Sequence, residues 1–213
     1  MTNFHFNGIE RLPESGEIQQ LFILMHGVGG SPANLMPLVN KLREVYSAAA
    51  FLLPEGTDPF DGGGSGRQWF SIKEVTEENR YTRVENALPA LHDLVVAAQA
   101  RFKVNQQNTV LGGFSQGAIM SLEYSVAHDG MVGSVLAFSG RSARLPTKAP
   151  TMSTVHLFHG QDDRVMPVSH SLAALERIEA LHGHATLDIA PSVGHQMHPV
   201  LIDRALARLQ AIN

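Results

Sequence analysis

The sequence contains no cysteine in its 213 residues. This absence excludes disulfide scaffolds, thiolate zinc sites, iron–sulfur clusters and cysteine nucleophiles. Charge is also scarce: 17% of the residues are charged, against a usual fraction of about 25%. The net charge is -4, from 16 basic and 20 acidic residues. Because nucleic-acid-binding domains usually carry a basic excess, we expect no nucleic-acid partner.

Long apolar runs are missing as well. The longest runs, such as residues 21–25 and 48–53, are far shorter than the roughly 20 residues of a membrane-spanning helix. Residues 1–17 show neither the basic nor the apolar region of a signal peptide. We therefore expect a cytoplasmic protein without a membrane span. The length and the 44% of hydrophobic residues predict a single domain over residues 1–213.

Short apolar runs alternate with amphipathic stretches of helical length. Runs that are apolar on both faces are typical of a sheet covered by helices on both sides, so we predict an α/β fold with a mostly parallel sheet. Pro89 predicts a kink or a later start in one helix. The strand-like runs are residues 20–25, 49–53, 109–111, 132–138, 154–158 and 186–190, and the helical stretches are residues 31–46, 80–102, 115–127, 168–181 and 199–212.

A candidate nucleophile follows the third of these runs. Residues 113–117 read GFSQG and fit the pattern G-x-S-x-G, between a buried strand and an amphipathic helix. In that context the serine, Ser115, stands on a sharp strand-to-helix turn that exposes its hydroxyl. A glycine-rich turn with an incidental serine would have the same letters, but its position between strand and helix favours the nucleophile.

A serine hydroxyl needs a base, and the base needs an acid to orient it. In folds of this kind the order along the chain is serine, acid, histidine. Asp162 and Asp163 both follow the strand-like run 154–158, and the residues alone leave the acid open between them. His195 follows the last run and is the best candidate for the base, with His198 as its close rival.

A tetrahedral intermediate formed at a nucleophilic serine also needs N–H donors for its oxyanion. One donor is expected to be the backbone N–H of Gln116, directly after the serine. The other is expected in the loop after the first buried strand, where residues 26–30 read HGVGG. The N–H of Val28 is the first candidate there and that of Gly29 the second.

Several motifs together resemble the carboxylesterase/acyl-protein thioesterase family of the α/β-hydrolase fold. They span residues 20–200 and are specific only in combination. The matching segments are HGVGG (26–30), GRQWFSI (66–72), GFSQGAIM (113–120), AFSG (137–140), HGQDDRVMP (159–167) and GH (194–195).

The resemblance implies an α/β-hydrolase fold and hydrolysis of carboxylic esters or thioesters, and the 213 residues leave little length for a large lid domain. It assigns the acid to Asp163 and implies a triad with Ser115 and His195. It also implies Val28 and Gln116 as oxyanion donors. The mechanism would pass through an acyl-enzyme and would need no cofactor or metal. Because a lid-gated lipase would need a longer chain, the expected partner is a small-molecule ester or thioester with a short or medium acyl chain.

The resemblance further implies that Trp69 and Phe70 lie near the acyl pocket. We add Gly29 and Met166 to these two as substrate-binding candidates. The chain departs from the family at Gly30 and Ser71, each of which replaces a usual aspartate, and at Met166, where valine is common.

Other readings of the sequence remain open. An amidase or peptidase could use the same triad, and a binding protein could share the fold without activity. Three histidine pairs, at positions 156 and 159, 182 and 184, and 195 and 198, lack the spacing of a helical metal motif. Apolar surface beside the site would support a homodimer.

Overall fold

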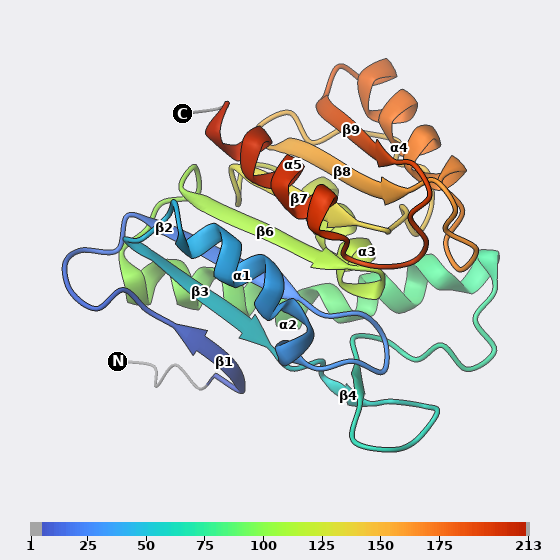
Figure 1. The fold of residues 1–213 in the computed structure, drawn as a ribbon. Helices are drawn as coiled ribbons and strands as arrows, with labels where there is room; N and C mark the ends of the chain where they lie inside the picture. Colours follow the sequence, from blue (N-terminus) through green and yellow to red (C-terminus); the bar gives the residue numbers. More distant parts are fainter. Residues whose placement is uncertain (1–5, 212–213) are drawn as a thin grey trace.

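The computed structural model describes residues 6–211. A seven-stranded sheet forms its centre, and a two-stranded hairpin lies beside it (Figure 1). The sheet strands are β1 (Gly8–Arg11), β2 (Gln20–Met25), β3 (Ala49–Pro54), β6 (Thr109–Phe114), β7 (Ser134–Phe138), β8 (Thr154–Gly160) and β9 (His184–Ala190), and the hairpin pairs β4 (Asp58–Pro59) with β5 (Arg67–Gln68). The helices are the 3-10 turn η1 (Pro32–Leu35), α1 (Met36–Arg43), α2 (Glu77–Phe102), α3 (Gln116–Ala127), α4 (Ser169–Ala180) and α5 (Pro199–Gln210).

The strand order is β1-β3-β2-β6-β7-β8-β9. Every neighbouring pair is parallel except β1 with β3, which is antiparallel. The carboxyl ends of β2, β6, β7 and β8 therefore meet along one edge of the sheet, where the sequence places the candidate site residues. The predicted α/β class with a mostly parallel sheet is confirmed.

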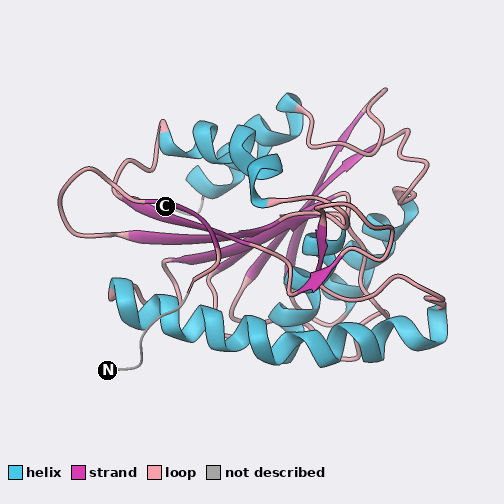
Figure 2. Ribbon diagram, turned by 90° about the horizontal axis from the view of Figure 1, so that it is seen from below, coloured by secondary structure: helices cyan, strands magenta, loops and turns pink. Residues whose placement is uncertain are grey.

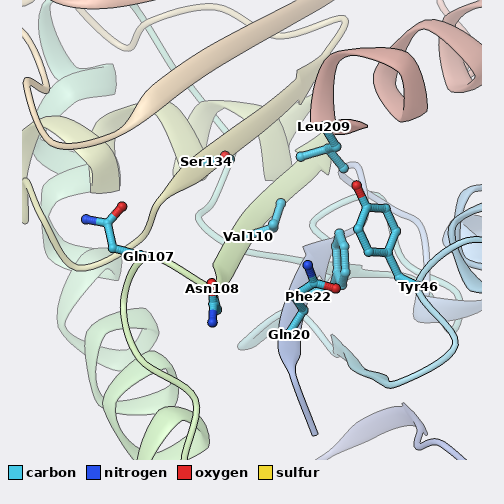
Figure 3. Close-up of a pocket in the computed structure, with 8 residues that line it drawn as sticks. All are labelled: Gln20, Phe22, Tyr46, Gln107, Asn108, Val110, Ser134 and Leu209. Atoms are coloured by element: carbon cyan, nitrogen blue, oxygen red, sulfur yellow. The ribbon is translucent and has the colours of Figure 1, made fainter. Parts of the chain in front are cut away.

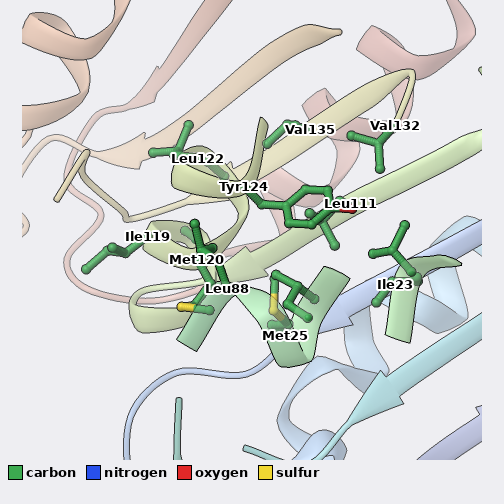
Figure 4. Close-up of a cluster of buried hydrophobic side chains, with 14 of the residues drawn as sticks. Ile23, Met25, Leu88, Leu111, Ile119, Met120, Leu122, Tyr124, Val132 and Val135 are labelled. Carbon is green, nitrogen blue, oxygen red and sulfur yellow. The ribbon is translucent and has the colours of Figure 1, made fainter. Parts of the chain in front are cut away.

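Helices cover both faces of the sheet, as Figure 2 shows with the sheet seen nearly edge-on. One face packs against α1 and α5 through a buried cluster that includes Phe22, Leu38 and Leu201. The other face packs against α2, α3 and α4 through the larger cluster shown in part in Figure 4. Between residues 6 and 211, no helix is both long and apolar enough to cross a membrane.

Some element boundaries differ from the sequence-based expectation. The helix around Pro89 is uninterrupted and starts earlier than predicted, at Glu77, because Thr76 caps it: the Thr76 hydroxyl accepts the Asn79 N–H. The strand β1 and the hairpin β4–β5 were not predicted. The expected end of the last helix, Ile212, lies outside the described residues. The long stretch between β3 and α2 holds only this hairpin and its loops, without a lid domain.

A buried carboxyl group on α3 predicts how stability depends on pH. Burial raises the pKa of Glu123 to about 7, although its Oε1 accepts the Ala143 N–H at 2.6 Å and Arg144 is nearby. Since this folded pKa exceeds the ordinary value of 4.5, Glu123 makes the folded chain less stable as pH rises from about 4.5 to 7. The difference corresponds to about 3 kcal/mol.

We therefore expect Glu123→Gln to raise the free energy of unfolding at pH 8 and to change it little at pH 4.5. The glutamine keeps an acceptor for the Ala143 N–H but has no charge to desolvate. Urea unfolding at both pH values measures the effect. An equal or lower stability of the variant at pH 8 would show that the carboxylate is well solvated in the folded chain.

Candidate active site

Ser115 stands at the junction of β6 and α3 in a strained backbone conformation. Its φ is 54° and its ψ is -111°, outside the regions that L-residues usually adopt. The flanking glycines allow the turn to pack tightly. A Cβ on Gly117 would lie 2.2 Å from the Met25 carbonyl oxygen, and one on Gly113 would lie 2.6 Å from the same atom. Only glycine fits at these two positions without displacing β2.

A chain of hydrogen bonds joins Ser115, His195 and Asp163. The Ser115 Oγ–H donates to Nε2 of His195 at 3.1 Å, and the Nδ1–H of that ring donates to Oδ2 of Asp163 at 2.7 Å. Because a carboxylate can only accept, it fixes the proton on Nδ1 and leaves Nε2 free to take the serine proton. The structure thus brings together the three residues predicted for the triad.

Asp163 is buried and held in place on both carboxylate oxygens. Its Oδ1 accepts the N–H groups of Val165 and Met166 at 2.9 and 2.8 Å. Burial acts to raise the pKa of Asp163, but these N–H groups and His195 outweigh it and leave the pKa below its ordinary value. The carboxylate is therefore ionised, as an acceptor for the imidazole N–H must be.

The alternatives that the sequence left open lie elsewhere. The side chain of Asp162 is exposed, and its backbone N–H donates to the carbonyl of Val193. His198 is the N-cap of α5, where its Nδ1 accepts the N–H of Val200 at 3.3 Å. Neither residue takes part in the hydrogen-bonded chain that ends at Ser115.

A second histidine, His159, lies against Asp163 and was not predicted. It is fully buried, and its Nε2–H donates to the Met166 carbonyl at 2.6 Å while lying 3.4 Å from Oδ2 of Asp163. Its Nδ1 accepts the hydroxyl of Ser171 at 2.7 Å. Burial lowers the pKa of His159, so the ring stays neutral. It supports the loop from which Asp163 meets His195.

The two predicted oxyanion donors face no protein acceptor. Within residues 6–211, no acceptor is found for the backbone N–H of Val28 or of Gln116. The N–H of Gln116 is the first of α3. The first N–H groups of a helix have no hydrogen-bond partner within the helix and attract negative charge. Gly29, the second candidate donor, is ruled out because its N–H donates to the Arg67 carbonyl at 2.8 Å.

His26 holds the loop that carries Val28. Its Nε2 accepts the Gly56 N–H at 3.0 Å, which places the ring proton on Nδ1, and that N–H donates to the Gly27 carbonyl at 2.7 Å. Burial lowers the pKa of His26 and keeps the ring neutral. The histidine of the HGVGG segment therefore fixes the shape of this loop and lies outside the proton-transfer chain.

Trp69 connects the two segments that carry the N–H groups of Val28 and Gln116. Its indole N–H donates to the His26 carbonyl at 2.8 Å, and its backbone N–H donates to Oε1 of Gln116 at 2.8 Å. The Nε2 group of the same glutamine donates to the Phe70 carbonyl at 2.7 Å. The Trp69–Phe70 segment is thus a brace between the loop of Val28 and the start of α3.

The brace predicts an effect of Trp69→Phe on turnover. Phenylalanine keeps an aromatic ring but cannot donate to His26, so the spacing of the two N–H groups loses one of its supports. Outright loss of an oxyanion donor costs about 100–1,000-fold in rate, and we expect a smaller fall in kcat, about tenfold, with little change in KM. Ester kinetics and a melting curve measure it. An unchanged kcat in a folded variant would show that the indole N–H does not set the spacing.

Two of the three positions that depart from the family can be related to their neighbours. A Cβ on Gly30 would lie 2.9 Å from Oδ1 of Asn34, which itself accepts the Ser31 N–H, and 3.0 Å from the Gly27 carbonyl oxygen, so a side chain there would require these atoms to shift. The hydroxyl of Ser71 donates to Oδ2 of Asp61 at 2.8 Å. This bond is the main reason why the pKa of Asp61 is lowered to about 2. The carboxylate of Asp61 fastens the hairpin loop to the residues after the brace.

Two cavities lie near the candidate site, and a third lies away from it. One of about 300 Å³ is lined by His195 and by the Val28 loop. A second, of about 410 Å³, is lined by Trp69, Phe70 and part of α2 but by none of the three hydrogen-bonded residues. The third lies between the starts of β2, β6 and β7, at the opposite edge of the sheet, and its volume of about 50 Å³ suits a water molecule (Figure 3).

The substrate-binding candidates therefore fall into different places. Trp69 and Phe70 border the second cavity, and their role in an acyl pocket stays a prediction. Gly29 is exposed in the loop beside Phe60, and Met166 is half-buried, with both backbone polar groups used around Asp163 and His159. Within residues 6–211, no group of three histidine or acidic side chains is arranged to hold a metal ion.

Comparisons with known proteins agree with this geometry. Residues 12–213 match the model of the phospholipase/carboxylesterase family. Esterase YpfH of Escherichia coli K12 is 39% identical over 192 residues, which cover 90% of this chain and 82% of the relative. Acyl-protein thioesterase 1 of Eremothecium gossypii is 26% identical over 208 residues, covering 89% of this chain and 86% of the relative.

Solved structures show the same fold. The crystal structure of esterase PE8 superimposes with a TM-score of 0.89 at 28% identity, over 97% of this chain and 99% of the other. The carboxylesterase of Bacillus cereus superimposes with a TM-score of 0.83 at 17% identity, over 99% and 96% of the two chains. The predicted α/β-hydrolase fold is thus confirmed.

Proposed function

Because the chain belongs to the phospholipase/carboxylesterase family and is an enzyme of the esterase or thioesterase class, we propose that it is a serine carboxylesterase with Ser115 as its nucleophile. The observation that carries the proposal is the hydrogen-bonded chain from Asp163 through His195 to the Ser115 hydroxyl. This arrangement supplies a nucleophile, a base in the right tautomer and a fixed negative charge behind the base.

In the first half of the proposed reaction, Ser115 Oγ attacks the carbonyl carbon of the ester. His195 Nε2 takes the hydroxyl proton as the Oγ–C bond forms, and the carbonyl oxygen becomes an oxyanion. The N–H groups of Val28 and Gln116 donate to it. When the oxyanion collapses, the bond to the leaving oxygen or sulfur breaks and His195 returns its proton to that atom. The acyl group remains on Ser115.

Water completes the reaction by the same steps. His195 Nε2 accepts a proton from the water molecule as its oxygen attacks the acyl carbon, and the tetrahedral intermediate again places its oxyanion against Val28 and Gln116. Collapse breaks the bond to Oγ, and the proton on His195 returns to Ser115. Asp163 stays ionised throughout and stabilises the imidazolium that forms twice. In each half of the reaction His195 accepts the proton and then donates it.

The proposed substrates are small esters, or thioesters, with short or medium acyl chains. The insertion between β3 and α2 is a short hairpin, which offers no cover for a long lipid chain. One relative is named an acyl-protein thioesterase, and a thioester would react by the same steps with sulfur as the leaving atom. Cytoplasmic residence and a homodimer stay predictions of the sequence.

A comparison of leaving groups tests this proposal. Matched p-nitrophenyl esters, from acetate to decanoate, p-nitroanilides and S-acyl thiols are offered to the wild-type chain. We expect turnover of the esters and thioesters, an optimum at a short or medium chain, and anilide hydrolysis slower by at least a factor of 100, because an amide nitrogen is a poorer leaving group. Faster anilide turnover would favour an amidase. No turnover of any substrate would favour a binding protein with this fold.

A further inference from the structure

The cavity beside His195 is walled almost entirely by uncharged atoms. Its lining includes Val28, Leu35, Phe114, His195 and Met197. The remaining lining residues are Gly27, Gly30, Asn34 and Gln196, so within residues 6–211 no aspartate, glutamate, lysine or arginine lines this cavity. Its exposed lining is more apolar than polar, and Asn34 already uses its Oδ1 to accept the Ser31 N–H.

The position of this cavity follows from the reaction at Ser115. A tetrahedral intermediate carries four groups: Oγ, the oxyanion, the acyl chain and the leaving atom. The oxyanion points to the N–H groups of Val28 and Gln116, and the leaving atom must lie within reach of His195 Nε2, because it receives the proton there. A group attached to the leaving atom therefore continues on the His195 side of the intermediate.

The cavity lies on that side. His195 itself forms part of the wall, and the ring of Phe114 stands 4.8 Å from the imidazole ring, centre to centre. The larger cavity beside Trp69 and Phe70 is unsuited to the same group, because it contains no part of His195 and includes the charged side chains of Asp58 and Arg83.

Resting on the proposed esterase function, we propose that this cavity is the leaving-group pocket and that it selects esters of uncharged, apolar alcohols. Its volume of about 300 Å³ is at the lower end of small-molecule sites, which suits an alkyl or aryl alcohol of about six carbons. A charged group would lose its hydration there without an ion pair in return. The acyl chain extends away from the cavity.

Two acetate esters of equal shape give the first test. Acetylcholine and 3,3-dimethylbutyl acetate differ by a charged nitrogen in place of a carbon, and both leave the same acetyl group on the enzyme. We expect kcat/KM for the neutral ester to be at least tenfold higher. Equal or better hydrolysis of the choline ester would overturn the proposal, while failure to hydrolyse either ester or any p-nitrophenyl ester would count against the esterase function itself.

Filling the cavity gives the second test. Met197→Trp narrows the pocket from one wall, and Met197→Phe does so more gently in case the larger ring prevents folding. We expect the ratio of kcat/KM for hexyl acetate over methyl acetate to fall at least tenfold, since a single methylene in an apolar pocket is worth about 10–200-fold. Met152→Trp, at an exposed position before β8, is the control and should leave that ratio unchanged.

The acyl chain is varied separately, with methyl esters from acetate to octanoate. If the cavity holds the leaving group, the relative rates along this series keep their wild-type order in the Met197 variants. A variant that shifts the acyl-chain preference instead would identify the cavity as the acyl pocket and overturn the proposal. A hexyl-to-methyl ratio that stays at the wild-type value in the folded variants would overturn it as well.

Discussion

Replacement of Ser115 by alanine is expected to lower kcat for p-nitrophenyl acetate by at least about 10⁴-fold. Removal of a nucleophilic serine leaves only the contribution of the oxyanion donors and of substrate binding, so the loss approaches the whole effect of the catalytic groups. The strained φ of 54° at this position makes alanine no worse for the backbone than serine. Ester kinetics together with a melting curve measure the change.

Ser47→Ala is the matched control, because Ser47 is an exposed serine far from the junction of β6 and α3. The control should keep the wild-type rate. A Ser115→Ala protein that folds and retains more than about a tenth of the activity would mean that another group attacks the ester, and the assignment of the nucleophile would be wrong.

The second large effect is expected for Asp163→Asn, a fall in kcat of roughly 10⁴-fold. The asparagine NH₂ group cannot accept the Nδ1–H of His195, so it favours the tautomer with the proton on Nε2. That nitrogen then donates to Ser115 and cannot take its proton. Because Asp163 is buried and hydrogen-bonded to His195, we expect KM to change little. Steady-state kinetics separate the two parameters.

Asp162→Asn is the control that the chain itself offers. The two aspartates are neighbours in sequence, but the side chain of Asp162 is exposed, so its amide should leave kcat within a factor of two. A large loss in Asp162→Asn, with a small one in Asp163→Asn, would reverse the assignment of the acid. Equal small losses would mean that His195 needs no carboxylate partner.

The catalytic candidates could be predicted because their signals lie in short segments with a clear position in the fold. The GFSQG turn follows a buried strand and precedes a helix, and Asp163 and His195 follow the ends of later strands in the required order. Parallel strands bring their carboxyl ends to one edge of the sheet, so residues far apart along the chain meet there. The resemblance to a family was still needed to choose Asp163 over Asp162.

The supporting contacts could not be predicted, because most of them use backbone atoms. The backbone N–H of Trp69 donates to Gln116, and its indole N–H donates to the backbone carbonyl of His26. The N–H of Gly29 is excluded as an oxyanion donor because it donates to the backbone carbonyl of Arg67. Such partners leave no residue-type pattern in the sequence. The edge strand β1 could not be predicted either. It has four residues, each exposed or half-exposed, and they show no apolar alternation.

The most direct test of the account is the site of covalent modification by a fluorophosphonate. Attack by an activated serine forms an Oγ–P bond, breaks the P–F bond and releases fluoride and a proton. We predict one phosphonyl group for each folded chain, located by peptide mass spectrometry on Ser115, and none in Ser115→Ala. Labelling at another residue, or an unlabelled Ser115 in a protein that hydrolyses esters, would contradict it.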